Sequence, residues 1–259
     1  MRLTKKDPIQ RYKTKLHGLN ALIVLSLSFC CLPGLVYAEL HGTLTGTTNY
    51  VYRMYSKSFN KPALQGNLDY QHSSGFYTGV SISSFHIGKS EVFEDIAFPG
   101  SAQAEFIPYL GWTFKLADNW RMDLQYSRYF YNAKIFNAAA EYNEFYAFLH
   151  YKELFTAMVS ASDDFYSIGA PAYFYELTGR YPITDYLEFS ATAGYARANE
   201  VYLSDYPYWN VGFTGRYKFI ALDLRYHDAR EILYGQPFNQ VDHPEAIRAE
   251  LVFSISVGF

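Results

Sequence analysis

The chain has little cysteine, little tryptophan and no long hydrophobic run in its main part. Its 259 residues include two cysteines and three tryptophans, against 26 tyrosines and 21 phenylalanines. A transmembrane helix needs about 20 consecutive apolar residues. After position 38 the sequence has no such run without polar residues. This lack excludes a bundle of transmembrane helices, so any membrane role must use β-strands.

The first 38 residues have the composition of a secretory signal peptide. Six basic side chains precede an apolar stretch from Ala21 to Leu32, and Val36 and Ala38 provide the small residues of a cleavage site. We therefore predict a signal peptide at 1–38 and a mature domain at 39–259, cleaved after Ala38. An N-terminal membrane anchor is the alternative, but Pro33-Gly34 interrupts the apolar run.

The mature domain has more acidic than basic residues and no cysteine. Without the leader, 16 Lys and Arg face 24 Asp and Glu, which gives a net charge of about −8. An excess of acid argues against nucleic acid as a partner, because no basic patch remains to neutralise phosphates. Both cysteines, Cys30 and Cys31, leave with the leader. We expect no disulfide, no cofactor and no metal site, since no residue spacing matches a specific metal site.

From Leu40 onward, apolar and polar residues alternate with a period of two, which is the pattern of half-buried strands. The end of the chain shows it best: Phe253, Ile255, Val257 and Phe259 share one face with Ile247, Ala249 and Leu251. A terminal strand of this kind, ending on Phe, resembles the assembly signal of bacterial outer-membrane barrels. We therefore expect barrel-assembly machinery to bind the C-terminal strand.

Twelve alternating segments are separated by connections whose lengths alternate between short and long. The segments are 40–55, 63–72, 75–86, 104–116, 119–131, 141–152, 153–161, 172–181, 186–197, 206–219, 220–228 and 246–259. Alternating short and long connections with an even number of strands are typical of bacterial transmembrane barrels. Hydrocarbon offers no hydrogen-bond partner to the backbone groups at a free strand edge, so such a sheet must close. We predict an all-β fold: a closed antiparallel transmembrane β-barrel of about 12 strands, with short periplasmic turns and longer extracellular loops. A soluble β-sandwich is the alternative.

The two faces of these segments differ in chemistry. The apolar face predicted to meet lipid includes Leu64, Leu68, Phe106, Leu110, Trp112, Leu187, Trp209 and Phe213. Aromatic residues concentrate near strand ends, which predicts two girdles at the membrane interfaces. The residues predicted to face the lumen are Arg53, Asp69, Glu105, Arg121, Asp123, Glu144, Glu176, Arg180, Glu188, Arg216, Asp223, Arg225, Arg248 and Glu250.

Hairpin geometry predicts three ion pairs across this inner face. Arg180 should lie opposite Glu188, Arg216 opposite Asp223, and Glu250 near Arg53 across the closing seam. These residues are either structural ion pairs that fill the barrel or the lining of a solute path. Twelve tilted strands give a backbone diameter of roughly 24 Å and, after side chains, a bore of roughly 10 Å or less. That size suits small solutes or a plugged barrel and excludes a wide general porin.

Several stretches resemble the TorF-type porin family, also described as a Gcw-type family of conserved bacterial proteins of unknown function. They are Tyr50-Val51-Tyr52-Arg53, Lys61 to Tyr70, Ser74 to Val80, Pro108 to Trp112, Tyr142 to Tyr146, Tyr175-Glu176-Leu177 and Val252 to Ser256. The resemblance spans nearly the whole mature domain. It implies an outer-membrane barrel with a porin role, and the family supplies no established substrate.

Three functions compete. We expect a non-enzymatic, porin-like channel in the bacterial outer membrane, surrounded by lipid and passing small solutes or ions through a narrow charged lumen. A structural or surface-interaction barrel with a plugged lumen is the alternative, using the acidic loops 87–103 and 229–245, where His243 stands beside Asp242 and Glu245. A lipid hydrolase would need Ser, His and Asp or Asn together. Its candidate, His72-Ser73-Ser74-Gly75, has the composition of a turn.

Overall fold

The computed structural model describes residues 38–84, 102–135, 139–230, 245–247 and 249–259, and residues Glu39–Phe259 form one compact unit. Residues 1–37 lie outside the described part, so the signal peptide stays a prediction. Among the described residues, no helix is both long and apolar enough to cross a bilayer.

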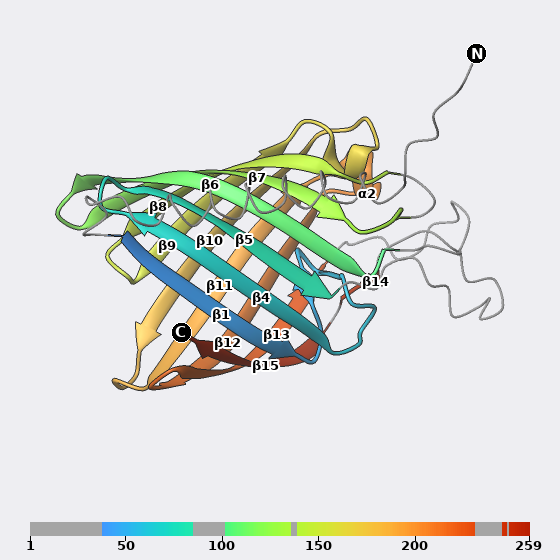
Figure 1. The fold of residues 1–259 in the computed structure, drawn as a ribbon. Helices are drawn as coiled ribbons and strands as arrows, with labels where there is room; N and C mark the ends of the chain where they lie inside the picture. Colours follow the sequence, from blue (N-terminus) through green and yellow to red (C-terminus); the bar gives the residue numbers. More distant parts are fainter. Residues whose placement is uncertain (1–37, 85–101, 136–138, 231–244, 248) are drawn as a thin grey trace, which may run out of the picture. The chain divides into compact units, whose positions relative to one another are not determined.

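Within the described residues, twelve antiparallel strands close into a barrel, as predicted (Figure 1). They are β1 (Ala38–Thr47), β4 (Ala63–His72), β5 (Phe76–Ser84), β6 (Ala104–Ala117), β7 (Trp120–Tyr131), β8 (Tyr142–Tyr151), β9 (Phe155–Ser162), β10 (Ala172–Pro182), β11 (Leu187–Arg197), β12 (Tyr206–Tyr217), β13 (Ile220–Ala229) and β15 (Glu250–Gly258). Each strand pairs with its sequence neighbour in the barrel, and β15 pairs with β1 and β13. Closure leaves no strand edge exposed to hydrocarbon.

The connections follow the predicted alternation of short and long. At one end of the barrel, which we call the turn end, tight turns join β4 to β5, β6 to β7, β8 to β9, β10 to β11 and β12 to β13. The other, loop end carries the longer connections, including the 3-10 helix η2 (Phe165–Ser167) and the short helix α2 (Asn199–Tyr202). A small sheet of β2 (Val51–Tyr52), β3 (Tyr55–Ser56) and β14 (Glu245–Ala246) lies at this end too (Figure 1).

The first and last predicted strands are too long. The alternation at 40–55 predicts one strand, but β1 ends at Thr47, and Arg53 and Met54 have φ values of 50° and 67°. Left-handed backbone makes a tight turn, so the chain doubles back as the β2–β3 hairpin. At the other terminus β15 begins at Glu250, because Ala246 pairs with Tyr55 of β3 instead of continuing the barrel.

The outer surface of the barrel is apolar along the strands. Leu64, Leu110 and Phe213 expose 64%, 50% and 48% of their surfaces, as expected for side chains that meet lipid. Ile247 is a correction: it was predicted on this face but is 2% exposed, because it follows β14 rather than lying on β15. Many exposed aromatic residues lie toward the strand ends, although Trp112, Phe213 and Phe253 lie nearer the middle. Those near the ends include Trp120, Tyr181, Tyr186, Tyr217 and Phe219 at the turn end, and Tyr173, Tyr175, Tyr195 and Trp209 at the loop end.

The two faces of β12 predict different responses to a new charge. Phe213→Arg should lower the free energy of unfolding by about 2–4 kcal/mol, because it places a charge in hydrocarbon. Thr214→Arg should cost much less, because Thr214 points inward and donates to Asp223 Oδ2 at 2.6 Å. Urea unfolding in lipid vesicles would measure both, and equal costs would show that the faces are assigned backwards.

Candidate functional site

Residues 48–62, which we call the inserted segment, connect β1 to β4 and fold into the loop-end part of the lumen. They include the β2–β3 hairpin. Polar side chains in an ordinary surface connection are exposed, yet Asn49, Ser56, Lys57 and Ser58 are 0–2% exposed. Because buried polar groups must be hydrogen bonded, the contacts of these side chains show what surrounds the segment.

Lys57 anchors the inserted segment to β6. Its Nζ lies 2.5 Å from Glu105 Oε2, and both side chains are buried. Tyr50 donates its hydroxyl to the other carboxylate oxygen at 2.8 Å. Burial lowers the pKa of Lys57, although the charge of Glu105 acts in the opposite direction. Burial and the charge of Glu105 raise the pKa of Tyr50 well above its usual value, which keeps this phenol a hydrogen-bond donor.

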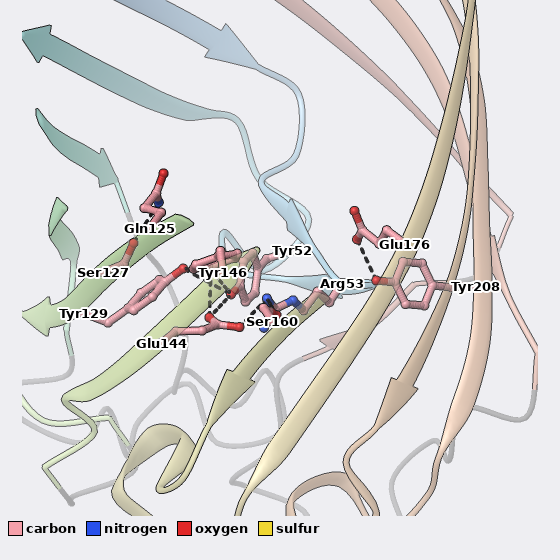
Figure 2. Close-up of polar contacts among 10 residues, drawn as sticks. All are labelled: Tyr52, Arg53, Gln125, Ser127, Tyr129, Glu144, Tyr146, Ser160, Glu176 and Tyr208. Atoms are coloured by element: carbon pink, nitrogen blue, oxygen red, sulfur yellow. Dashed lines mark hydrogen bonds and ion pairs between the residues drawn. The ribbon is translucent and has the colours of Figure 1, made fainter. Parts of the chain in front are cut away.

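Arg53 anchors the segment to β8 and β9 (Figure 2). It forms a buried ion pair with Glu144 and donates to Ser160 Oγ at 2.7 Å. The guanidinium also lies over the ring of Phe174, 3.5 Å from its centroid. Burial is the largest single influence and lowers the pKa of Arg53, but Glu144 and the neighbouring tyrosines together raise it by more, so the pKa lies well above the usual value. Arg53 therefore stays charged inside the barrel.

Tyrosine hydroxyls complete the binding of Glu144 (Figure 2). Tyr52 and Tyr146 both donate to its Oε2, at 3.0 and 2.8 Å. The hydroxyls of Tyr129 and Tyr146 lie 2.6 Å apart, which extends the network to β7. Glu144 thus accepts hydrogen bonds from Arg53, Tyr52 and Tyr146. These are the charge-assisted hydrogen bonds that a buried carboxylate requires.

The inserted segment reaches the opposite wall as well. Asn49 Nδ2 donates to Glu250 Oε1 of β15 at 2.8 Å, and Tyr206 of β12 donates its hydroxyl to the Arg53 carbonyl at 2.9 Å. Large buried side chains, among them Met54 and Phe165, pack around these contacts. With the contacts to β6, β7, β8 and β9, these bonds tie the segment to strands around the barrel. The lumen is filled at this level.

All three predicted ion pairs are wrong. Arg53 pairs with Glu144, whereas Glu250 binds Asn49, because the turn at Arg53 carries this residue away from β1. Arg180 aligns with Ser190, two residues beyond the predicted Glu188, and donates to Thr156 Oγ1 at 2.8 Å.

The β12–β13 register is shifted in the same way. Arg216 aligns with Ala221 rather than Asp223, because the turn consists of residues 218–219, with Lys218 at a φ of 54°. Arg216 instead lies 3.5 Å from Glu188, and Asp223 lies 3.0 Å from Arg225. A turn displaced by one residue therefore moves each charged pair by two positions.

The remaining predicted residues have separate surroundings. Asp69 accepts from Asn67 at 2.7 Å and from the Tyr109 hydroxyl. Asp123 lies 2.9 Å from His150 and 3.7 Å from Arg121, and Glu176 accepts from Tyr208 at 2.6 Å. Arg248 lies outside the described residues, as do most of loops 87–103 and 229–245 with His243. The proposed assembly residues Phe253, Ile255, Val257 and Phe259 are all exposed on β15 or just after it.

Sequence reasoning missed the residues that hold the inserted segment. Lys57 fell in a predicted loop at 56–62, and uncharged Tyr52, Tyr146 and Ser160 were not considered for the inner face. One signal was present: Glu105 and Glu144 stand near the loop ends of their strands on the inward face. Such carboxylates need cations, and the following loops could have been searched for them.

The hydrolase candidate His72-Ser73-Ser74-Gly75 lies where β4 turns into β5. There His72 Nδ1 and Ser74 Oγ are 2.8 Å apart and exposed. No group of three His, Cys, Asp or Glu side chains in the described part of the chain is placed to hold a metal ion.

A closed barrel of this kind is the fold of outer-membrane porins. The solved NanC porin has a TM-score of 0.51 and 11% identity, covering 84% of this chain and 98% of that chain. The KdgM porin has a TM-score of 0.51 and 6% identity, covering 85% of this chain and 98% of that one. At such identity the likeness shows the fold alone.

The sequence, unlike the fold, assigns the chain to a protein family. Residues 38–255 match the family described as "bacterial protein of unknown function (Gcw_chp)", and the chain belongs to this family. The predicted Gcw-type resemblance is thereby confirmed. No curated protein matches the sequence significantly.

Proposed function

We propose that the protein is an outer-membrane channel for small solutes or ions, closed at its loop end at rest by the inserted segment. The observation that carries this proposal is the division of the lumen into two halves. The loop-end half is filled by residues 48–62, whereas the turn-end half is lined by charged side chains of both signs. The porin-like barrel favours passage over catalysis, and the predicted signal peptide would bring the chain to the bacterial outer membrane.

The turn-end half has the chemistry of a wet path. Arg121 and Arg216 are 43% and 57% exposed although they point inward, so their guanidinium groups meet solvent. Exposed ion pairs contribute little to stability, typically about 0–1 kcal/mol. Charges of both signs along a lumen instead stabilise ions and polar solutes that lose part of their water. A narrow charged bore therefore suits small hydrophilic solutes.

A plugged structural barrel is the second candidate, and the buried ion pairs of the inserted segment favour it. Two charges taken out of water are costly unless the pairing is close and further hydrogen bonds are present. Both Lys57–Glu105 and Arg53–Glu144 meet these conditions. The difference between the candidates is whether the inserted segment leaves the lumen under working conditions.

Reconstitution into planar bilayers tests the proposal. We expect the purified wild-type protein to give discrete but infrequent conductance steps, because ions cross only when residues 48–62 are displaced. The steps should become more frequent in mild urea below the barrel's unfolding transition, since urea weakens the buried contacts. Electrical silence under all these conditions, at several salts and voltages, would contradict a channel and favour the plugged barrel.

A further inference from the structure

A cavity of about 320 Å³ lies in the lumen directly against the inserted segment. Its lining comes from both sides: Arg53 and Met54 belong to the segment, and Phe148, Met158, Glu176 and Tyr208 belong to the wall. The volume is at the lower end of the range for small-ligand sites, about 300–1,000 Å³. Apolar and aromatic walls with a few polar groups are also typical of such sites.

Two charged side chains line the cavity, Glu176 and Arg53. One oxygen of Glu176 accepts the Tyr208 hydroxyl at 2.6 Å, and the carboxylate forms no ion pair with a basic side chain of the described residues. The charge of Arg53 is compensated by Glu144 on the other side (Figure 2). The cavity therefore holds one carboxylate whose charge lacks a cation.

The remaining lining suits an organic cation better than a metal ion. Tyr146 and Phe148 lie with their rings nearly parallel, 5.7 Å between centroids, and Tyr208 adds a third aromatic ring, whereas Arg53 and Lys57 already lie over the ring of Tyr52. Aromatic faces attract ammonium groups through the ring quadrupole. The sulfur atoms of Met54 and Met158 are polarisable and tolerate apolar substituents on the nitrogen. Ca²⁺ and Mg²⁺ would instead need several oxygen ligands.

We propose that this cavity binds a small organic cation, an amine or quaternary ammonium compound, with Glu176 as its counter-ion. The inference deepens the proposed function, because it names the class of solute that the channel would take. A cation in this cavity would touch Met54 on the inserted segment and Glu176 and Tyr208 on the wall. The ligand would therefore contact both the wall and the segment that closes the lumen.

Choline and its uncharged analogue 3,3-dimethylbutan-1-ol test the charge requirement, because a carbon atom replaces the nitrogen and the shape is kept. Calorimetric titration of the detergent-solubilised protein should show binding of choline, and the alcohol should bind at least about tenfold more weakly. Equal affinity, or no binding of choline, tetramethylammonium or n-butylamine at millimolar concentration, would overturn the proposal.

Two glutamine variants test whether choline binding depends on Glu176. Glu176→Gln should weaken choline binding by about tenfold or more and leave binding of the neutral alcohol unchanged. Glu188→Gln is the matched control: Glu188 lies on the next strand, β11, pairs with Arg216 and does not line the cavity. Equal losses in both variants would show that only the net charge of the lumen matters and would overturn the site.

The outcome separates the inference from the channel function. Choline bound through Glu176 by a protein that never conducts would contradict the channel and leave the site intact. Conductance steps with no Glu176-dependent binding would support the channel and overturn the site. Conductance steps that choline shortens in the wild type but not in Glu176→Gln would support both.

Discussion

We expect that a barrel in which residues 49–61 are replaced by four residues, with Asn-Gly at their centre, conducts continuously, whereas the wild-type barrel is mostly closed. The inserted segment fills the lumen between β6, β8, β9, β12 and β15. Its removal leaves twelve strands around a bore of roughly 10 Å. Mean conductance should rise at least about tenfold, because a water-filled bore of that width admits hydrated ions.

The barrel itself offers a place for the new turn. Gly46 of β1 and Leu64 of β4 are near neighbours where the barrel closes, since a methyl group added at Gly46 would lie 3.8 Å from the Leu64 side chain. A two-residue hairpin turn flanked by short arms can therefore join the strands. Glu105→Gln and Glu144→Gln should accompany the deletion, because both carboxylates lose their buried cations.

Two controls make the result interpretable. The double variant Glu105→Gln/Glu144→Gln with residues 49–61 intact shows how much of the rise comes from releasing the segment and how much requires its removal. Retention of the folded barrel can be checked by urea unfolding in vesicles, where the lipid-facing side chains are unchanged. A deletion variant that is folded and electrically silent would show that another part of the chain closes the lumen.

The barrel could be predicted from sequence because its main constraint is local. Alternation puts Leu64 and Phe213 on one face, and only closure protects the backbone of such strands in hydrocarbon. The alternating connection lengths then order the strands as neighbours. Neither inference requires knowing which residues meet across the lumen.

The inserted segment could not be predicted from this pattern. Tyr50 and Tyr52 alternate with their neighbours as they would in a barrel strand, and only the left-handed turn at Arg53 and Met54 departs from it. The contacts that hold the segment inside are long-range; Lys57 and Glu105, for example, are 48 positions apart. Tertiary contacts thus override the local strand signal. The predicted ion pairs were wrong for a related reason, since the register between two strands depends on the exact residue at which their turn closes.

Glu144→Gln is expected to release the inserted segment from a barrel that stays folded. The change leaves the Arg53 guanidinium buried without its counter-ion, and removal of one partner of a buried pair costs about 3–5 kcal/mol. The loss should fall on the segment rather than on the strands, which keep their backbone bonds and their contact with lipid. Arg53 and Lys57 become trypsin sites on release, since both are buried in the closed state, whereas Lys61 precedes Pro62 and is not cleaved.

Trypsin cleavage of the vesicle-embedded protein measures this release, because its rate follows the population of the open form when opening and closing are fast. Glu144→Gln should accelerate cleavage within 48–62 at least about a hundredfold. Glu153→Gln is the control: Glu153 is 88% exposed and 3.6 Å from Arg121, so its loss should change little. Arg53→Met with Glu144→Gln should restore part of the protection at Lys57, because no unpaired charge stays buried. Unchanged cleavage in Glu144→Gln would mean that the tyrosine and serine hydrogen bonds hold the segment without the ion pair.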